Sequence, residues 1–328
     1  MNIRPNVYVT RMLPEAAIDL LAAHCDVEVN PEDRVLERVE LLEKVKGRDA
    51  VISLLTDTID DEILVAAGPQ CKIFANYAVG FNNIDLSAAT KRGVVITNTP
   101  DVLTDATADL AWTLLFATAR RVVEAEKFLR DGKYQGWGPM LLLGLDVTGK
   151  TLGIIGSGRI GSSFASKAKG FNMKVVYNDI AANPEFEAAT GGVFTDKERL
   201  LQQADFVSLH VPLLPSTHHL MSDKEFSLMK KTAILINTSR GPVVDEKALA
   251  RALKNGEIWG AGLDVFENEP AVDPDLLECA NTVLLPHVAS ATIETRTNMG
   301  LIAVRNILNI FSGKPPITCV NPAVLQAE

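Results

Sequence analysis

Three polar residues in the second half of the chain have side chains that are suited to one reaction. Arg240 follows the apolar run 234–236, His287 follows the run 283–285, and Glu269 lies in a Glu-Asn-Glu-Pro segment. An arginine fork holds a carboxylate through two parallel hydrogen bonds, and a histidine transfers a proton near neutral pH. A neighbouring carboxylate orients the ring and stabilises its protonated form. These types predict reduction of a 2-oxo acid, with Arg240, Glu269 and His287 as catalytic residues.

A glycine-rich turn predicts the binding site of the reductant. The segment Gly156-Ser157-Gly158-Arg159-Ile160-Gly161 follows a strand pattern at 152–155 and precedes a helical pattern at 162–169. In this context the glycines allow a tight turn, a close approach of the backbone to a pyrophosphate and close packing of the helix on the strand. The turn therefore predicts a dinucleotide cofactor, with its pyrophosphate at the N-terminus of the helix.

An acidic residue predicts which dinucleotide binds. Asp179 ends the strand pattern at 174–177 and lies 18 residues beyond Gly161, close to the spacing of about 20 at which an acid accepts the ribose hydroxyls of NAD. A carboxylate at that place repels the 2′-phosphate of NADP. The sequence therefore predicts NAD as the cofactor, with NADH preferred over NADPH.

Alternating strand and helix patterns position these residues. The expected strands are mostly near-continuous apolar runs, which is typical of parallel strands buried on both faces. They lie at 7–10, 50–55, 72–76, 94–98, 151–155, 174–177, 206–209, 233–236, 260–263 and 282–285. We therefore expect an α/β protein with two Rossmann-like, doubly wound parallel-sheet domains.

The same patterns predict the domain boundaries. Residues 1–100 together with 291–328 are expected to form a discontinuous substrate-binding domain, and residues 101–290 an NAD-binding domain. Residues 106–130 read as one long helix that is apolar on several faces, which favours burial in a domain or subunit interface. Five glycines then mark 132–149 as an irregular connector.

Composition excludes several other classes of protein. A net charge of −9 and the absence of a basic run give no field for nucleic acid. No apolar stretch is long enough to span a membrane, and no signal-like segment opens the chain, so we expect a cytoplasmic protein. The scattered Cys25, Cys71, Cys279 and Cys319 predict neither disulfides nor a metal site. His24 and the loop pair His218-His219 read as solvated or locally bonded residues.

Four segments resemble the D-isomer-specific 2-hydroxyacid dehydrogenase family, and the likeness extends over nearly the whole chain. They are residues 156–161, 236–245, 262–270 and 286–292. The resemblance implies that Arg240, Glu269 and His287 are the catalytic set. Within the family, Ser53-Leu54-Leu55-Thr56-Asp57 and Trp137-Gly138-Pro139 make the chain most similar to glyoxylate and hydroxypyruvate reductases. Ala289 and Asp109 stand where the family usually has glycine and glutamate.

The resemblance also implies further site residues and a homodimer that pairs through the helix at 106–130. For the substrate it implies backbone N–H groups of Val79 and Gly80 beside Arg240, and a pocket shaped by Leu55 and Trp137. For the cofactor it implies contacts from Thr107, Gly156, Gly158, Arg159, Ile160, Gly161, Asp179, Val211, Pro212, Thr217, Thr238, Ser239, Asp264 and Ser290.

Three alternatives remain open at this point. A phosphite dehydrogenase resembles the family with a lysine where this chain has Val79. A phosphoglycerate dehydrogenase is compatible with the catalytic set, although no extra cation for a substrate phosphate is evident. A non-enzymatic, NAD-sensing corepressor scaffold also retains such residues and is distinguished by long disordered extensions and by lack of turnover.

Overall fold

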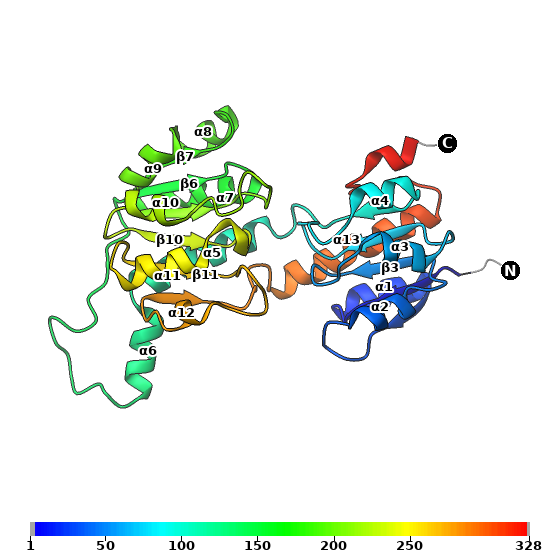
Figure 1. The fold of residues 1–328 in the computed structure, drawn as a ribbon, viewed down its shortest axis with the longest axis horizontal. Coiled ribbons are helices and arrows are strands. Elements are labelled where there is room, and N and C mark those ends of the chain that lie inside the picture. Colours follow the sequence, from blue (N-terminus) through cyan, green and yellow to red (C-terminus); the bar gives the residue numbers. More distant parts are fainter. Residues whose placement is uncertain (1–3, 327–328) are drawn as a thin grey trace. The chain divides into compact units, whose positions relative to one another are not determined.

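The computed structural model describes residues 4–326, which form two compact units. Unit 1 comprises residues 4–103 and 290–326, and unit 2 comprises residues 104–289. Each unit is a parallel β-sheet with helices packed against it (Figure 1). The predicted α/β class with two parallel-sheet domains is confirmed. Among helices of the described residues, none combines the length and apolar character needed to cross a membrane.

Unit 1 contains five parallel strands in the order β2-β1-β3-β4-β5. They are β1 (Asn6–Val9), β2 (Asp26–Val29), β3 (Ala50–Ser53), β4 (Ile73–Asn76) and β5 (Val95–Thr97). The helices are α1 (Glu15–His24), α2 (Arg38–Lys44), α3 (Asp61–Ala67), α4 (Leu86–Lys91), α13 (Ile293–Phe311) and the short 3₁₀ helix η3 (Pro322–Gln326).

Both ends of the chain build the core of unit 1. Helix α13 packs on α1 and β4, and Gly300 approaches Ala17 so closely that a Cβ would lie 2.6 Å from the Ala17 Cβ. The Tyr77 hydroxyl donates to the carbonyl of Arg296 at 2.6 Å. Near the C-terminus, Asn321 Oδ1 accepts from the N–H of Ile96 at 2.8 Å. Residues 293–321 therefore complete the core around the sheet that the first hundred residues make.

Unit 2 contains seven parallel strands in the order β12-β11-β10-β9-β6-β7-β8. They are β6 (Thr151–Ile155), β7 (Lys174–Asn178), β8 (Val193–Phe194), β9 (Phe206–Leu209), β10 (Ile234–Asn237), β11 (Gly260–Leu263) and β12 (Thr282–Leu284). The helices are α5 (Thr104–Ala119), α6 (Val122–Arg130), α7 (Arg159–Lys167), α8 (Pro184–Thr190), α9 (Lys197–Gln203), α10 (Asp223–Leu228), α11 (Glu246–Lys254) and α12 (Pro274–Leu277), with 3₁₀ turns η1 (Ala168–Phe171) and η2 (Gly241–Val243).

Side chains of one strand enter two cores, because alternate residues face opposite sides of a sheet. Ile234 and Ile236 pack with α5 and α7, whereas Leu235 packs with α9, α10 and α11. If β6 is taken as strand 1, the order across the sheet is 3-2-1-4-5-6-7. This is the 3-2-1-4-5-6 order of a doubly wound dinucleotide-binding sheet with one strand added at the edge. The order reverses between β6 and β9, and ligands of such sheets bind beyond the carboxyl ends of the strands at that point.

The predicted single helix at 106–130 is wrong, because two helices occupy this stretch. Helix α5 ends at Ala119 and α6 begins at Val122, with Arg121 in the left-handed conformation at φ 53°. The Ala119 carbonyl accepts the N–H of Leu145 at 2.8 Å. A residue of the connector thus takes the acceptor that a continuing helix would have used, and the chain bends there (Figure 1).

Candidate active site

The glycine turn of unit 2 has the geometry that its sequence predicts. Gly156 has a φ of 99°, and a Cβ there would lie 2.6 Å from the carbonyl oxygen of His210. A Cβ on Gly161 would lie 2.1 Å from the carbonyl oxygen of Gly156, so the start of α7 rests directly on the turn. At Gly158, by contrast, a Cβ would have open space around it. This opening leaves room for a pyrophosphate beside the first turn of α7.

Asp179 is fixed against the glycine turn. Its Oδ2 accepts the N–H of Ser157 at 2.7 Å and the Ser157 hydroxyl at 2.6 Å, and its Oδ1 accepts the N–H of Ile180 at 2.7 Å. Burial alone would raise the pKa of Asp179, but these donors together lower it below its ordinary value. The carboxylate is therefore ionised at neutral pH and points at the turn from the end of β7.

A short loop after β9 carries three of the predicted cofactor residues. The Thr217 hydroxyl donates to the carbonyl of Pro212 at 2.7 Å and accepts the N–H of Leu214 at 2.8 Å, which closes the loop that begins at Val211. His210 precedes it, and burial lowers the pKa of its imidazole to about 3. That ring is neutral, and its Nε2 lies 2.9 Å from the Ser208 hydroxyl.

The turn after β10 holds Arg240 in place. Asn237 is buried, its Oδ1 accepts from the N–H and hydroxyl of Ser239 at 3.0 and 2.7 Å, and its Nδ2 donates to the Arg240 carbonyl at 3.0 Å. Within residues 4–326, the Thr238 hydroxyl oxygen is buried without a hydrogen-bond partner. A buried polar atom without a partner is expected where a ligand supplies the missing hydrogen bond. The end of β10 is therefore compatible with a bound dinucleotide.

Arg240 is a cation in a mostly buried position. Burial lowers the pKa of its guanidinium, and the charge of Glu269 opposes that shift. Arginine nevertheless stays protonated in proteins. Its Nη1 donates to the carbonyl of Ser239 at 2.7 Å. Within the described residues, no carboxylate lies close enough to the guanidinium to form a salt bridge. The cation is therefore available to an anionic substrate.

His287 and Glu269 form a direct pair. His287 Nδ1 lies 2.8 Å from Glu269 Oε2, and Glu269 Oε1 accepts the N–H of Phe266 at 2.9 Å. Burial would raise the pKa of Glu269, but the hydrogen bond and charge of His287, the Phe266 N–H and the charge of Arg240 lower it. An ionised Glu269 fixes the ring through Nδ1 and leaves Nε2 as the nitrogen for proton transfer.

Asp264 supports the loop that carries His287. Its side chain is fully buried, Oδ1 accepts the N–H of Val288 at 2.8 Å, and Oδ2 accepts the N–H of Ala289 at 2.7 Å. Burial raises the pKa of Asp264, against the lowering effect of these two donors. His287 itself has a left-handed backbone with φ 55°, a conformation that the two bonds help to hold. The predicted contact of Asp264 with the cofactor stays a prediction.

Unit 1 carries an array that fits a carboxylate. Asn98 Nδ2 donates to the carbonyl of Val79 and Asn76 Nδ2 to that of Gly80, each at 2.9 Å. With both carbonyls held by these amides, the N–H groups of Val79 and Gly80 donate to no acceptor within the described chain. Leu55 is a partly exposed residue on a turn of the same unit. Asp57 closes this turn, because its Oδ2 accepts the N–H of Leu54 at 2.8 Å.

The predicted residues therefore fall into distinct groups. Arg240, Glu269, His287 and Asp264 all follow strands of unit 2, as do the glycine turn and Asp179. Thr107 is buried in α5, and Ser290 is the first residue of the second segment of unit 1. Trp137 is 84% exposed on the connector, away from any core. Nothing in the sequence marks Asn237, Gly241, Asn76 or Asn98 as site residues, because an amide or glycine inside a motif gives no separate chemical signal.

A family model for the NAD-binding domain of D-isomer specific 2-hydroxyacid dehydrogenases matches residues 112–289. The chain belongs to the D-isomer specific 2-hydroxyacid dehydrogenase family. A glyoxylate reductase from Thermococcus gammatolerans is 48% identical over 330 residues, which cover 99% of this chain and 98% of that protein. The predicted family is thereby confirmed, and the chain is a dehydrogenase that uses a nicotinamide cofactor.

Two solved structures show the same architecture. The TT0316 protein from Thermus thermophilus superposes with a TM-score of 0.90 and 44% identity, covering 96% of this dehydrogenase and 99% of that chain. An NADPH-dependent glyoxylate/hydroxypyruvate reductase from Sinorhizobium meliloti, in complex with NADP and malonate, has a TM-score of 0.84 and 33% identity, covering 98% of each chain.

Proposed function

We propose that this dehydrogenase reduces glyoxylate and hydroxypyruvate with NADH and gives the D-isomer where the product is chiral. The observation that carries the proposal is the His287–Glu269 pair, with Nδ1 and Oε2 2.8 Å apart and the charge of Arg240 close by. The names of the relatives support the choice of substrate. Unit 2 is the cofactor domain in this proposal, and unit 1 the substrate domain.

Arg240 and the N–H groups of Val79 and Gly80 bind the substrate carboxylate in this proposal. A guanidinium offers two parallel donors to a carboxylate and also polarises the neighbouring ketone. The two N–H groups need no rearrangement, since their own carbonyls are already held by Asn98 and Asn76. A small acid is thus oriented by its carboxylate. Leu55 limits the size of its other substituent, and Trp137, which is exposed within one chain, would do so by reaching into the site of the partner subunit of the proposed dimer.

His287 supplies the proton. NADH, when bound, supplies a hydride from C4 of its nicotinamide to C2 of the substrate. The developing alkoxide needs an acid, and protonated His287 donates through Nε2 while Glu269 stabilises the imidazolium through Nδ1. In the reverse direction the same nitrogen accepts the proton of the hydroxyl group.

The preference for NADH rests on Asp179 and its neighbour. The carboxylate of Asp179 is ionised and sits where the adenosine ribose is expected. Ile180, which follows it, is 99% exposed and carries no charge with which to bind a 2′-phosphate. These two residues favour NADH in this proposal.

The experiment is a substrate panel with purified enzyme. Loss of NADH absorbance is followed with glyoxylate, hydroxypyruvate, pyruvate and 3-phosphohydroxypyruvate, and formation of NADH from NAD⁺ is followed with phosphite. Each assay is repeated with NADPH or NADP⁺. We expect the highest kcat/KM for the first two acids with NADH. A clear preference for the phosphorylated acid or for phosphite, or tight NADH binding without turnover, would contradict the proposal.

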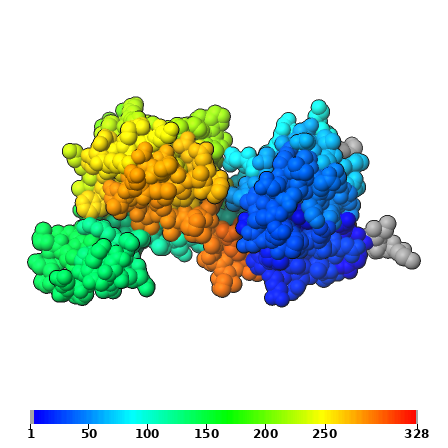
Figure 2. Space-filling model, turned by 60° about the horizontal axis from the view of Figure 1, so that its bottom comes forward, coloured from blue at the N-terminus to red at the C-terminus, as the bar shows by residue number. Residues whose placement is uncertain are grey.

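A homodimer is the assembly we propose. Helix α6 has no buried residue, and with the connector it projects from the body of unit 2 as the lobe at residues 120–145 in Figure 2. This lobe exposes large apolar side chains, namely Val122, Val123, Leu129, Tyr134, Trp137, Met140, Leu141 and Leu143. Apolar area of this kind on one lobe is typical of a subunit interface. Light scattering that gives the mass of one chain would contradict this assembly.

A further inference from the structure

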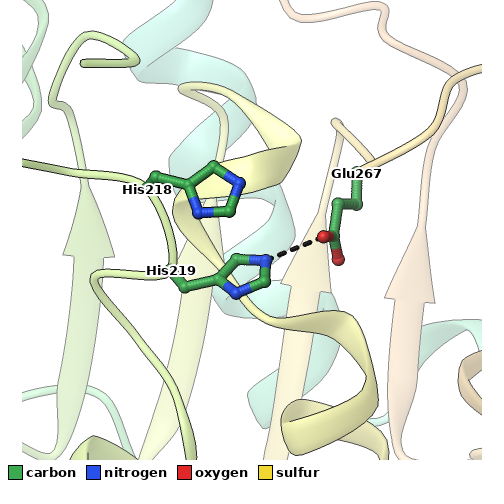
Figure 3. Close-up of side chains that lie close together, drawn as sticks. All are labelled: His218, His219 and Glu267. Carbon is green, nitrogen blue, oxygen red and sulfur yellow. Dashed lines mark hydrogen bonds and ion pairs between the residues drawn. The ribbon is translucent and has the colours of Figure 1, made fainter. Parts of the chain in front are cut away.

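Two histidines and a glutamate of unit 2 gather outside the catalytic pair. His218, His219 and Glu267 each offer one ligand atom, and these atoms lie within 4.8 Å of one another. Figure 3 shows both imidazoles on one loop and the carboxylate approaching from the segment after β11. His219 Nε2 lies 2.7 Å from Glu267 Oε1, and the two rings stack with centroids 4.1 Å apart.

The backbone holds His219 in this orientation. Its φ of 49° is left-handed, and its N–H donates to the carbonyl of Pro242 at 2.8 Å. The loop before it is closed by the Thr217 hydroxyl. Because a left-handed residue that is not glycine costs free energy, the ring position is fixed by the surrounding loop rather than by the preference of the residue.

Glu267 is fixed from the other side. Its N–H donates to Glu246 Oε1, and its own Oε2 lies 3.4 Å from the N–H of Glu246. This reciprocal contact leaves Oε1 directed at His219. Asp245 Oδ2 lies 4.0 Å from Nδ1 of the same ring. His219 thus has Glu267 at Nε2 and Asp245 near Nδ1. A metal-binding histidine commonly has a carboxylate beside the nitrogen that does not bind the metal, and Asp245 is placed for that role.

His218 has no structural partner that accounts for its place. Within the described residues its side chain forms no hydrogen bond or ion pair, and its one ring contact is with His219. A salt bridge between His219 and Glu267 needs no second imidazole. The ring of His218 therefore adds an uncommitted nitrogen ligand next to an ordered histidine–carboxylate pair.

We propose that His218, His219 and Glu267 form a binding site for a divalent transition metal of the zinc class. Two imidazoles and one carboxylate suit Zn²⁺ or Co²⁺, whereas Mg²⁺ and Ca²⁺ prefer oxygen ligands. Bonds of about 2.0–2.1 Å place tetrahedral ligands roughly 3.3 Å apart, so His219 and Glu267 separate slightly and His218 moves inward. Water fills the fourth position, and Asp245 supports His219 from behind.

This site is separate from the proposed chemistry, yet it lies on the same segment. Glu267 stands two residues before Glu269, and the ligands join that segment to the loop before α10. An ion that binds the folded state and not the unfolded chain raises the melting temperature. Zn²⁺ should therefore stabilise unit 2 even when neither substrate nor cofactor is present.

The test uses full-length enzyme without an affinity tag and Co²⁺ as a spectroscopic probe. The chelator-treated protein is titrated with CoCl₂, and visible absorption, bound metal per chain and melting temperature are measured. We expect one Co²⁺ per chain, the strong visible bands of four-coordinate cobalt, displacement by ZnCl₂ and a rise in melting temperature with added metal.

Three variants decide which residues bind. His218→Ala should weaken metal binding by more than about tenfold and leave the metal-free melting temperature unchanged. Asp245 is the N-cap of α11, where its Oδ1 accepts the N–H of Ala248 at 2.9 Å. Asp245→Asn keeps a good N-cap residue and should weaken metal binding by about tenfold. His24→Ala, an exposed histidine of unit 1, is the matched control and should bind as the unaltered enzyme does. Equal binding by His218→Ala, or no stoichiometric binding by the unaltered enzyme, overturns the proposal.

Discussion

Gly241 packs directly on the main chain of Phe266, so that a Cβ on Gly241 would lie 1.8 Å from the Phe266 carbonyl oxygen. This contact joins the turn that holds Arg240 to the segment that holds Glu269. Backbone atoms cannot move aside as a flexible side chain can. The distance between the two catalytic loops therefore depends on the absence of a side chain at one position.

Gly241→Ala should consequently separate these loops. We expect a loss of at least about 1–3 kcal/mol of stability, the usual cost of overpacking, and a large fall in kcat. Denaturant unfolding and steady-state kinetics measure the two effects. The control is Gly170→Ala, where a Cβ meets nothing within 4 Å. If Gly241→Ala had the kcat of the wild-type enzyme, the spacing between the Arg240 turn and the Glu269 segment would not matter for catalysis.

The strands of unit 2 could be predicted closely, except for the two-residue edge strand β8, whereas the break in the 106–130 stretch could not. Buried parallel strands such as β9 and β11 are continuous apolar runs, so composition alone marks them. The end of α5 depends on the hydrogen bond from Leu145 to Ala119, a contact with a residue far along the chain. Strand β2 was also missed, since its sequence Asp-Val-Glu-Val lacks an apolar run.

His287→Ala should abolish most turnover while leaving NADH binding intact. Loss of a general acid costs about 10²–10⁴-fold in rate, and the substitution leaves the residues of the glycine turn unchanged. Stopped-flow or steady-state rates with glyoxylate give kcat, and quenching of protein fluorescence gives the affinity for NADH. Retention of more than about a tenth of kcat is incompatible with the role of His287 in proton transfer.

Asp264→Asn distinguishes a positioning residue from a cofactor ligand. The amide nitrogen cannot accept the N–H of Val288 or Ala289, so one donor is left unsatisfied at a cost of about 1–3 kcal/mol. We expect a lower melting temperature without cofactor and a fall in kcat larger than the change in NADH affinity. If Asp264 acts only on the nicotinamide, NADH affinity falls and the melting temperature of the cofactor-free enzyme stays the same.

Asp179→Asn should shift cofactor use toward NADPH. The amide keeps an acceptor oxygen for Ser157 but removes the negative charge that repels a 2′-phosphate. We expect the ratio of kcat/KM for NADPH to that for NADH to rise about tenfold, which corresponds to about 1.4 kcal/mol. Ile180→Ala retains the carboxylate and serves as the control, with an unchanged ratio. An unaltered ratio in Asp179→Asn would remove the argument for NADH.

Asp205→Asn should destabilise unit 2 in a manner that depends on pH. Burial alone would raise the pKa of Asp205, but Lys230 Nζ at 2.8 Å and the Thr151 N–H at 2.9 Å lower it in the folded state. A depressed pKa contributes stability above the unfolded value of about 3.9, and this is lost as pH falls through the folded value.

The melting temperatures of Asp205→Asn and wild type should therefore differ by about 2–4 °C at pH 7 and converge below about pH 4. Scanning calorimetry across this range measures the difference. Glu198→Gln removes one partner of the exposed pair with Lys224 and should change little at any pH. A difference that is constant with pH would mean that charge is not the cause.

The catalytic residues could be predicted because their side-chain types match the needs of a reaction. The residues that hold them in position could not be predicted in this way. Arg240, Glu269 and His287 are recognisable by function, and the structure places them on neighbouring strand ends. Asn237 holds the Arg240 turn through hydrogen bonds that only the folded geometry reveals. The pairing of His219 with Glu267 spans 48 residues, so no local spacing indicated it.

The construction of unit 1 from both chain ends has a consequence for the order of events during synthesis on the ribosome. Unit 2 is one continuous stretch, 104–289, and can close its core as soon as it has emerged. The first 103 residues emerge earlier but lack α13, which packs on α1 and β4. The half-domain of residues 4–103 therefore waits, with an uncovered apolar face, until α13 has also emerged, so it reaches its native packing after unit 2 although it is made before unit 2.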